Sequence, residues 1–106
     1  MLEHRTESRL PAEIEIRIAA LSEDGTPFAQ TALARNISLS GGLLTGLQRK
    51  LRSGDLMRVQ YRDSQARFRV VWTGSAGRNG PFSAAVHKLK EESCPWAELL
   101  IECASK

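Results

Sequence analysis

The chain has 106 residues, a length that accommodates one ordinary domain. Its composition, 42% hydrophobic and 25% charged, is globular and excludes a disordered, collagen-like or coiled-coil chain as the main description. No apolar run approaches the roughly 20 residues that span a bilayer, and the N-terminus lacks the apolar core of a signal peptide. We therefore expect a cytoplasmic protein without membrane insertion.

The net charge of +3 is unevenly distributed along the sequence. Residues 1–24 are acidic overall, residues 35–69 carry eight Arg or Lys against two Asp, and residues 70–106 balance. Eleven of the fifteen basic residues are Arg, whose planar guanidinium suits phosphate and guanine better than Lys does. This charge distribution indicates an anionic partner or, as an open alternative, a solvated face that keeps the protein soluble.

Alternating side chains predict two strands in the first third of the chain. The first strand follows Pro11 and has an apolar face made of Ile14, Ile16 and Ile18. Turn-forming residues at 22–27 end this strand. A second strand is expected from about Ala29 to Ile37, with its core-facing and outward-facing residues alternating. We expect Leu33 and Ile37 to face the core, and Ala32, Ala34 and Asn36 to face outward.

The middle of the chain predicts a short strand, a hairpin and a further strand. Residues 38–42 interrupt the second strand, residues 43–44 restart pairing, and residues 49–55 form a charged loop. Two alternating runs at 57–62 and 67–72 then indicate a hairpin. Its inward aromatic residues are expected to be Tyr61, Phe68 and Trp72, and its outward arginines Arg58, Arg62, Arg67 and Arg69. A glycine-containing loop covers 74–80, and residues 82–89 are the sixth candidate strand.

The C-terminal residues predict one helix, with Ser93 as its N-cap and Pro95 in its first turn. Its apolar stripe consists of Trp96, Leu99, Leu100 and Cys103. We expect this stripe to cover one end of a small antiparallel β-barrel, because closing six short strands into a barrel removes their unpaired edges. Cys94 and Cys103 are expected to be reduced packing residues that do not bridge each other.

No residue set in the sequence points to catalysis. No nucleophile-elbow pattern surrounds any Ser, and no glycine-rich loop has the Lys-Ser/Thr ending that a phosphate loop needs. His4 and His87 stand apart from the two cysteines and show no metal-ligand spacing. We therefore expect neither enzymatic activity nor a metal or cofactor.

Two short motifs suggest a binding function. The first is Arg5-Thr-Glu-Ser-Arg9, which precedes the first strand, and the second is Asn36-Ile-Ser-Leu-Ser-Gly41, at the end of the second strand. If the strand alternation continues, Asn36 and Ser38 share the outer face. Gly41 lacks the Cβ that would keep a flat ligand away from the backbone.

In this order and at these positions, the two motifs resemble the signature of the PilZ domain family of cyclic di-GMP receptors, R-x-x-x-R followed by D/N-x-S-x-x-G. The resemblance extends over nearly the whole chain. It implies a mainly β fold, a six-stranded antiparallel split barrel with a C-terminal α-helix, which agrees with the barrel expected from periodicity. It divides the chain into a flexible N-terminal arm at 1–10 and a single barrel domain at 11–106.

The resemblance also implies a ligand, cyclic di-GMP, and a set of residues that bind it. Arg5 and Arg9 would clamp the dinucleotide, because a guanidinium can take a phosphate or a guanine edge with two hydrogen bonds and can stack on a base. Asn36 and Ser38 would bond a guanine edge or phosphate, and Gly41 and Gly42 would permit close approach. Binding would order the arm and pass a signal to a downstream protein partner.

Two other functions remain open at the level of sequence. The chain could be a PilZ-like adaptor that has lost nucleotide binding and acts only through protein contacts, using the apolar helix stripe or the basic hairpin. It could also bind single-stranded nucleic acid through the four hairpin arginines. We favour nucleic acid least, because the hairpin aromatics that could stack on bases are expected to face inward.

Overall fold

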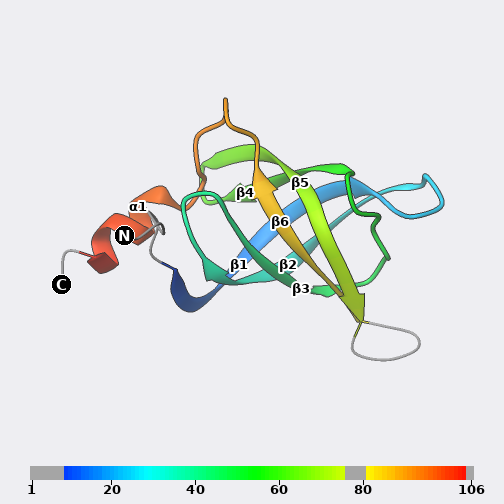
Figure 1. The fold of residues 1–106 in the computed structure, drawn as a ribbon, viewed down its shortest axis with the longest axis horizontal. Helices are drawn as coiled ribbons and strands as arrows, with labels where there is room; N and C mark the ends of the chain where they lie inside the picture. Colours follow the sequence, from blue (N-terminus) through cyan, green and yellow to red (C-terminus); the bar gives the residue numbers. More distant parts are fainter. Residues whose placement is uncertain (1–8, 76–80, 105–106) are drawn as a thin grey trace, which may run out of the picture.

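The computed structural model describes residues 9–75 and 81–104 of the chain. In this part six strands and one helix follow one another along the sequence (Figure 1). They are β1 (Leu10–Leu21), β2 (Pro27–Ile37), β3 (Gly41–Leu47), β4 (Leu56–Tyr61), β5 (Ser64–Ser75), β6 (Phe82–Lys88) and α1 (Ala97–Ala104).

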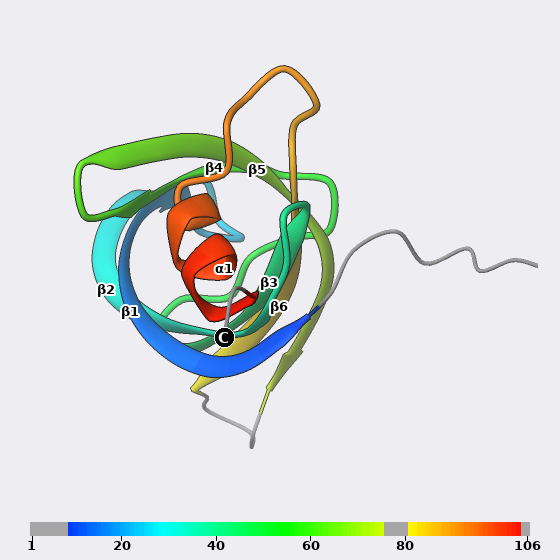
Figure 2. The same cartoon turned by 90° about the vertical axis from the view of Figure 1, so that its left-hand side faces the viewer.

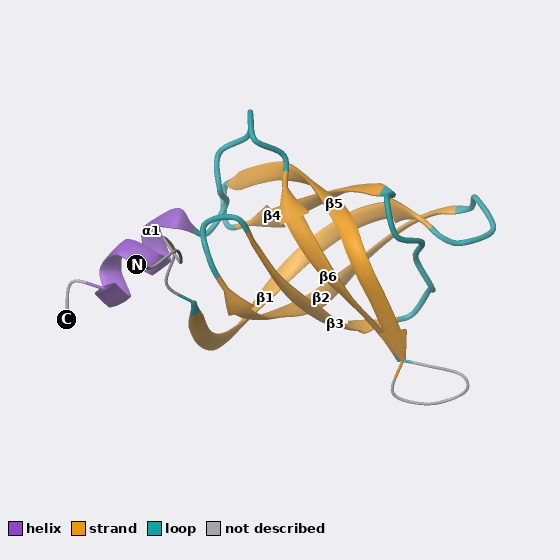
Figure 3. Cartoon of the chain, in the orientation of Figure 1, coloured by secondary structure: helices purple, strands orange, loops and turns teal. Residues whose placement is uncertain are grey.

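The strands form a closed antiparallel barrel in the order β1-β2-β3-β6-β5-β4, which confirms the predicted fold class (Figure 3). Closure between β4 and β1 is brief, from the pair Arg17 and Gln60 to the pair Ala19 and Arg58. The core fills the barrel with aliphatic side chains from the alternate positions of the strands, together with Phe68 and Trp96. No helix within the described residues has the length and apolar character needed to cross a membrane.

Helix α1 covers one end of the barrel, as Figure 2 shows in the view along the barrel. Leu99 and Leu100 pack against the core from this helix, and Trp96, immediately before it, is completely buried. The predicted role of the apolar stripe as a barrel cover is therefore confirmed for these three residues. The helix begins at Ala97, four residues after the expected N-cap Ser93, and the carbonyl of Cys94 accepts the amide of Ala97.

The predicted facing of β2 is wrong over most of the strand. Ala32 and Ala34 are buried, whereas Leu33 is 38% exposed. The facing changes at Asn36, which adopts a positive φ of 52° opposite a register shift in β1. Ile37 then points into the core as predicted, because this irregularity makes Arg35 and Asn36 two consecutive exposed residues.

The predicted facing of β5 fails at Trp72, for a similar reason. Phe68 and Val70 are buried as expected, but the pairing with β6 shifts register between Val70 and Trp72. The extra residue of this bulge leaves Val71 and Trp72 both more than half exposed. A bulge of this kind leaves no mark in the period-two pattern of a single sequence, so the pattern predicts the wrong face for Trp72.

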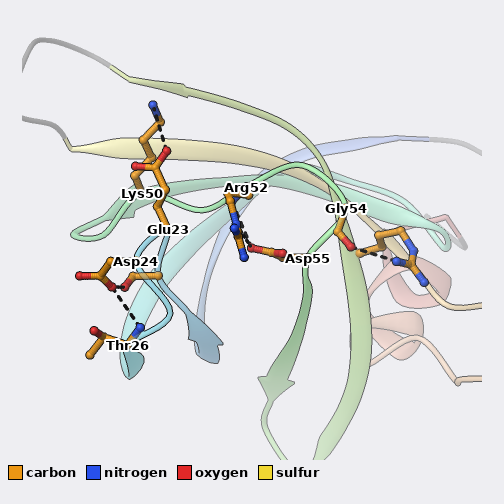
Figure 4. Close-up of polar contacts among 9 residues, drawn as sticks. Glu23, Asp24, Thr26, Lys50, Arg52, Gly54 and Asp55 are labelled. Atoms are coloured by element: carbon orange, nitrogen blue, oxygen red, sulfur yellow. Dashed lines mark hydrogen bonds and ion pairs between the residues drawn. The ribbon is translucent and has the colours of Figure 1, made fainter.

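The β1–β2 turn and the loop between β3 and β4 lie at the barrel end opposite α1 (Figure 1), and Figure 4 shows polar contacts of these segments. The amide of Glu23 donates to the carbonyl of Lys50 at 2.7 Å, and the two side chains lie 3.8 Å apart. Asp24 accepts hydrogen bonds from the hydroxyl of Ser22 and the amide of Thr26. These bonds lower the pKa of Asp24 from 3.8 to about 2, because they stabilise its ionised form.

Candidate ligand-binding site

Arg9 of the first motif and Asn36 of the second lie together at the α1 end of the barrel. The guanidinium Nη1 of Arg9, just before β1, lies 3.4 Å from the backbone carbonyl oxygen of Asn36 at the end of β2. The antiparallel pairing of β1 and β2 explains this contact, because it pairs Leu10 with Ile37 and so brings together residues 27 positions apart. Arg5, the other predicted arginine of the clamp, lies outside the described residues.

Asn36 is exposed and held in the left-handed backbone region. Asparagine tolerates this conformation better than most residues that have a Cβ. Its side chain faces solvent beside Arg35, whose Nε lies 3.6 Å from a carboxylate oxygen of Glu13. Asn36 therefore has two roles. Its backbone shapes the bend formed by residues 36–42, and its side-chain amide is exposed on the surface.

Ser38 does not share the outer face with Asn36, so that prediction is wrong. The residue is only 3% exposed, and its hydroxyl lies 3.4 Å from the hydroxyl of Ser40 and 3.3 Å from the amide of Ser40. The serine of the N-x-S-x-x-G pattern therefore stabilises a local turn. The reason is that β2 ends at Ile37, so Ser38 belongs to the turn that follows and no longer obeys the strand alternation.

Gly41 is required by the packing of two strands. A Cβ at this position would lie 2.0 Å from the carbonyl oxygen of Val86 in β6, closer than any real contact of this kind. Gly42 is less restricted, because a Cβ there would lie 3.1 Å from the Cγ2 of Ile37. The glycine of the motif is thus explained by the close approach of β3 and β6, whether or not a ligand also uses this space.

The outer face next to this bend runs across four strands to Trp72. Register pairs link Arg35 to Leu43, Leu43 to Ala85, and Ala85 to Trp72. Three strand spacings of about 4.8 Å separate the ends of this row, so it spans about 14 Å. The ring of Trp72 lies over Gly74, where an added Cβ would meet it at 2.4 Å. We name Arg35, Leu43, Ala85 and Trp72 the outer row; it has Arg35, which also pairs with Glu13, at one end and a flat aromatic ring at the other.

The outer row offers contacts suited to a nucleotide, and the sequence reasoning missed its aromatic member. Exposed aromatic rings stack on bases, and guanidinium groups pair with phosphates. The period-two pattern predicts that Trp72 faces the inside of the barrel, and the bulge in β5 brings it to the surface instead. Trp72 is therefore exposed and able to stack on a base, contrary to the prediction, whereas Phe68 is buried as predicted.

Three of the four predicted hairpin arginines have partners within the protein. Arg67 lies 2.8 Å from a carboxylate oxygen of Glu92, and Arg69 donates to the carbonyl of Gly54. The guanidinium of Arg62 lies 5.0 Å above the ring of Tyr61. The hydrogen bonds from the side chain and amide of Arg67 lower the pKa of Glu92. These contacts make the hairpin less available to an outside polyanion than its sequence suggests.

The described residues contain no group of three or more His, Cys, Asp or Glu side chains that could hold a metal ion. Of the two histidines, His87 is exposed on β6, where it is the register partner of both Gly41 and Arg69. The side chains of Arg9, Asn36 and Trp72 at the bend and the outer row can hydrogen-bond, pair with anions and stack.

Comparison with protein-family models, with curated proteins and with solved structures finds no match for this chain.

Proposed function

We propose that this chain is a receptor for cyclic di-GMP of the PilZ type, without enzymatic activity. In this proposal the arginines of the N-terminal arm close over a dinucleotide that lies against the bend of residues 36–42. Ordering of the arm then changes the surface offered to a downstream protein partner.

The observation that carries the proposal is the contact between Arg9 and the carbonyl of Asn36. An arginine of the first motif lies beside the first residue of the second, on the same end of the barrel. A ligand held by the guanidinium of Arg9 would therefore be within reach of the exposed side chain of Asn36. The outer row adds support, because a dinucleotide needs both cationic and stacking contacts.

The revised position of Ser38 changes the proposed contacts. Because its side chain is buried and bonded to Ser40, we assign Ser38 to shaping the bend rather than to touching the ligand. Asn36 and Arg9 remain the described residues proposed to bind the dinucleotide directly, with Arg5 as the second arm of the clamp. Gly41 and Gly42 allow the backbone of β3 to lie close to β6 and to Ile37.

Isothermal titration calorimetry with cyclic di-GMP tests this proposal, with cyclic di-AMP as the nucleotide control. We expect micromolar or tighter binding of cyclic di-GMP, and a loss of about 1–3 kcal/mol, or roughly 5- to 150-fold, in Arg9→Ala. Arg58→Ala is the matched control, since Arg58 starts a second R-x-x-x-R spacing on β4 and its removal changes the net charge equally. Absence of heat with the native protein, or equal losses in both variants, would contradict the proposal.

One observation favours the alternative of an adaptor that acts without nucleotide. Val71 and Trp72 expose adjacent apolar side chains on β5, 54% and 53% accessible, in a stretch from Val70 to Ser75 that contains no charge. Adjacent exposed apolar residues of this kind are typical of protein contacts. For an adaptor, Trp72→Ala abolishes retention of the partner protein whereas Arg9→Ala leaves it unchanged, with and without cyclic di-GMP.

A further inference from the structure

The bend between β2 and β3 is held from the C-terminal end of the chain. The indole Nε1 of Trp96 donates to the backbone carbonyl of Ser38 at 2.8 Å, across 58 residues of sequence. Trp96 is completely buried, and its ring lies 5.4 Å from that of Phe68, at an interplanar angle of 36°. Trp96, which hydrogen-bonds to the bend, is therefore itself packed in the barrel core.

The carbonyl of Ser38 depends on this donor. Within residues 9–75 and 81–104, the other donor recorded near it is the thiol of Cys94, at 3.9 Å, and a thiol is a weak donor. The rest of the bend is fixed by two backbone bonds, from the amide of Ser38 to the carbonyl of Gly41 at 2.8 Å and from the amide of Lys88 to the carbonyl of Ser40 at 2.6 Å. Loss of the indole donor would leave a buried carbonyl without a strong partner, which favours movement of the bend.

We infer that Trp96 is a positioning residue for the cyclic di-GMP site, and that docking of α1 and occupancy of this site are coupled through its bond to Ser38. The inference rests on the proposed function. Trp96 does not reach the outer surface, so it acts on the ligand only by fixing the backbone between Asn36 and Gly41. The carbonyl of Trp96 also accepts the amide of Leu100 in the first turn of α1, so one residue joins the bend to the helix.

Coupling of this kind is reciprocal. If the docked position of Trp96 strengthens ligand binding by a given factor, the ligand strengthens the docking of Trp96 and α1 by the same factor. This makes α1 a second element, besides the N-terminal arm, through which occupancy could reach a partner. The exposed side of α1 carries Ile101, which is 65% accessible, next to the acidic Glu102.

Trp96→Phe separates the hydrogen bond from the packing, because phenylalanine keeps an aromatic ring beside Phe68 but has no N–H. We expect this variant to bind cyclic di-GMP about tenfold more weakly, the loss typical of one buried hydrogen bond. Hydrogen exchange of the Ser38 amide should accelerate at the same time, also about tenfold relative to the native protein. The control is Ile18→Val, a core change on β1 where it pairs with β4, which should lower the melting temperature and leave both readouts unchanged.

A measurement on the native protein gives the reciprocal test and needs no variant to fold. Saturation with cyclic di-GMP should slow exchange of the Leu100 amide in α1, whereas cyclic di-AMP should leave it unchanged. Unchanged affinity and unchanged Ser38 exchange in Trp96→Phe, or native Leu100 exchange that is indifferent to bound ligand, overturns the coupling. If the native protein binds no cyclic di-GMP, the proposed function is wrong, and so is the coupling of α1 to the ligand. Hydrogen exchange of the Ser38 amide in Trp96→Phe then still decides whether Trp96 fixes the bend.

Discussion

Replacement of Gly41 by alanine should destabilise the barrel strongly, even without any ligand. The new Cβ would lie 2.0 Å from the carbonyl oxygen of Val86 and 3.3 Å from the Cα of His87. Both atoms belong to the backbone of β6, so no side-chain rotation can relieve the clash. Strands β3 and β6 must separate locally, where Gly41 pairs with His87 and Gly42 with Val86. Overpacking typically costs 1–3 kcal/mol, and with a backbone obstacle we expect about 3 kcal/mol or more.

The control for this prediction is Gly25→Ala in the β1–β2 turn. Gly25 has a φ of +88°, but a Cβ there meets nothing within 4 Å, so only backbone strain of about 1–2 kcal/mol is expected. Urea unfolding of both variants, followed by circular dichroism, gives the two losses in free energy of unfolding. The reasoning is refuted if Gly41→Ala loses no more stability than Gly25→Ala. If it holds, loss of ligand binding in Gly41→Ala reports on the fold and cannot serve as proof of a ligand contact.

Three further changes test other parts of the structure. Because the pKa of Asp24 is lowered to about 2, its contribution to stability should be complete above pH 3.8 and be lost as the pH falls toward 2. Urea midpoints between pH 2 and 5 should therefore fall less steeply in Asp24→Asn than in the native protein, and parallel curves would refute this. Glu92→Gln should lower the melting temperature at pH 7 by removing the nearer of the two carboxylates that pair with Arg67, and the difference should shrink as the pH falls below 4.5 and the native carboxyl becomes protonated; a difference independent of pH contradicts it. Binding of cyclic di-GMP should quench the fluorescence of the exposed Trp72, and Trp72→Phe should lose most of the signal; quenching that persists in this variant would place the ligand elsewhere.

Asn36→Gly offers a cleaner test of the surface amide than alanine does. Glycine accepts the positive φ at this position, so the bend is preserved while the amide is removed. We expect cyclic di-GMP affinity to fall about 5- to 150-fold, as for loss of a hydrogen bond whose partner stays desolvated, with little change in the melting temperature. Native affinity in Asn36→Gly would remove this side chain from the proposed site.

The strands and the barrel could be predicted from the sequence because the period-two pattern is strong where it is regular. In β1 the isoleucines at 16 and 18 are buried as expected, and in β4 the same holds for Met57 and Val59. The positions of these strands follow from local alternation, and closure follows from the number of short strands in a small chain. The helix stripe was predictable for a similar reason, since its apolar spacing leaves Leu99 and Leu100 on one face.

The errors arise where the backbone departs from regular geometry. The irregularity at Asn36 changes the facing within β2, so the small side chains of Ala32 and Ala34 line the core, and the end of the strand at Ile37 leaves Ser38 in a buried turn. The bulge after Val70 exposes Trp72 in the same way. Neither irregularity can be recognised from residue types alone. Both depend on the register between neighbouring strands, which the sequence of one strand does not contain.

The candidate site was predictable as a pair of motifs, but the division of roles within it was not. The sequence predicts that Arg9 and Asn36 contribute to one binding site, and the structure places the guanidinium of Arg9 3.4 Å from the carbonyl oxygen of Asn36. The sequence could not show that Gly41 is required by the carbonyl of Val86, or that Trp96 holds the bend from 58 residues away. Both are long-range contacts that only the folded barrel creates.

The most direct test of the central claim is a titration of the isotope-labelled protein with cyclic di-GMP, followed by amide chemical shifts. The account predicts saturable shifts at Arg9, at residues 36–42 and at Trp72, with cyclic di-AMP producing none of comparable size. Shifts confined to the arginines of the β4–β5 hairpin, or no shifts at millimolar ligand, would contradict it.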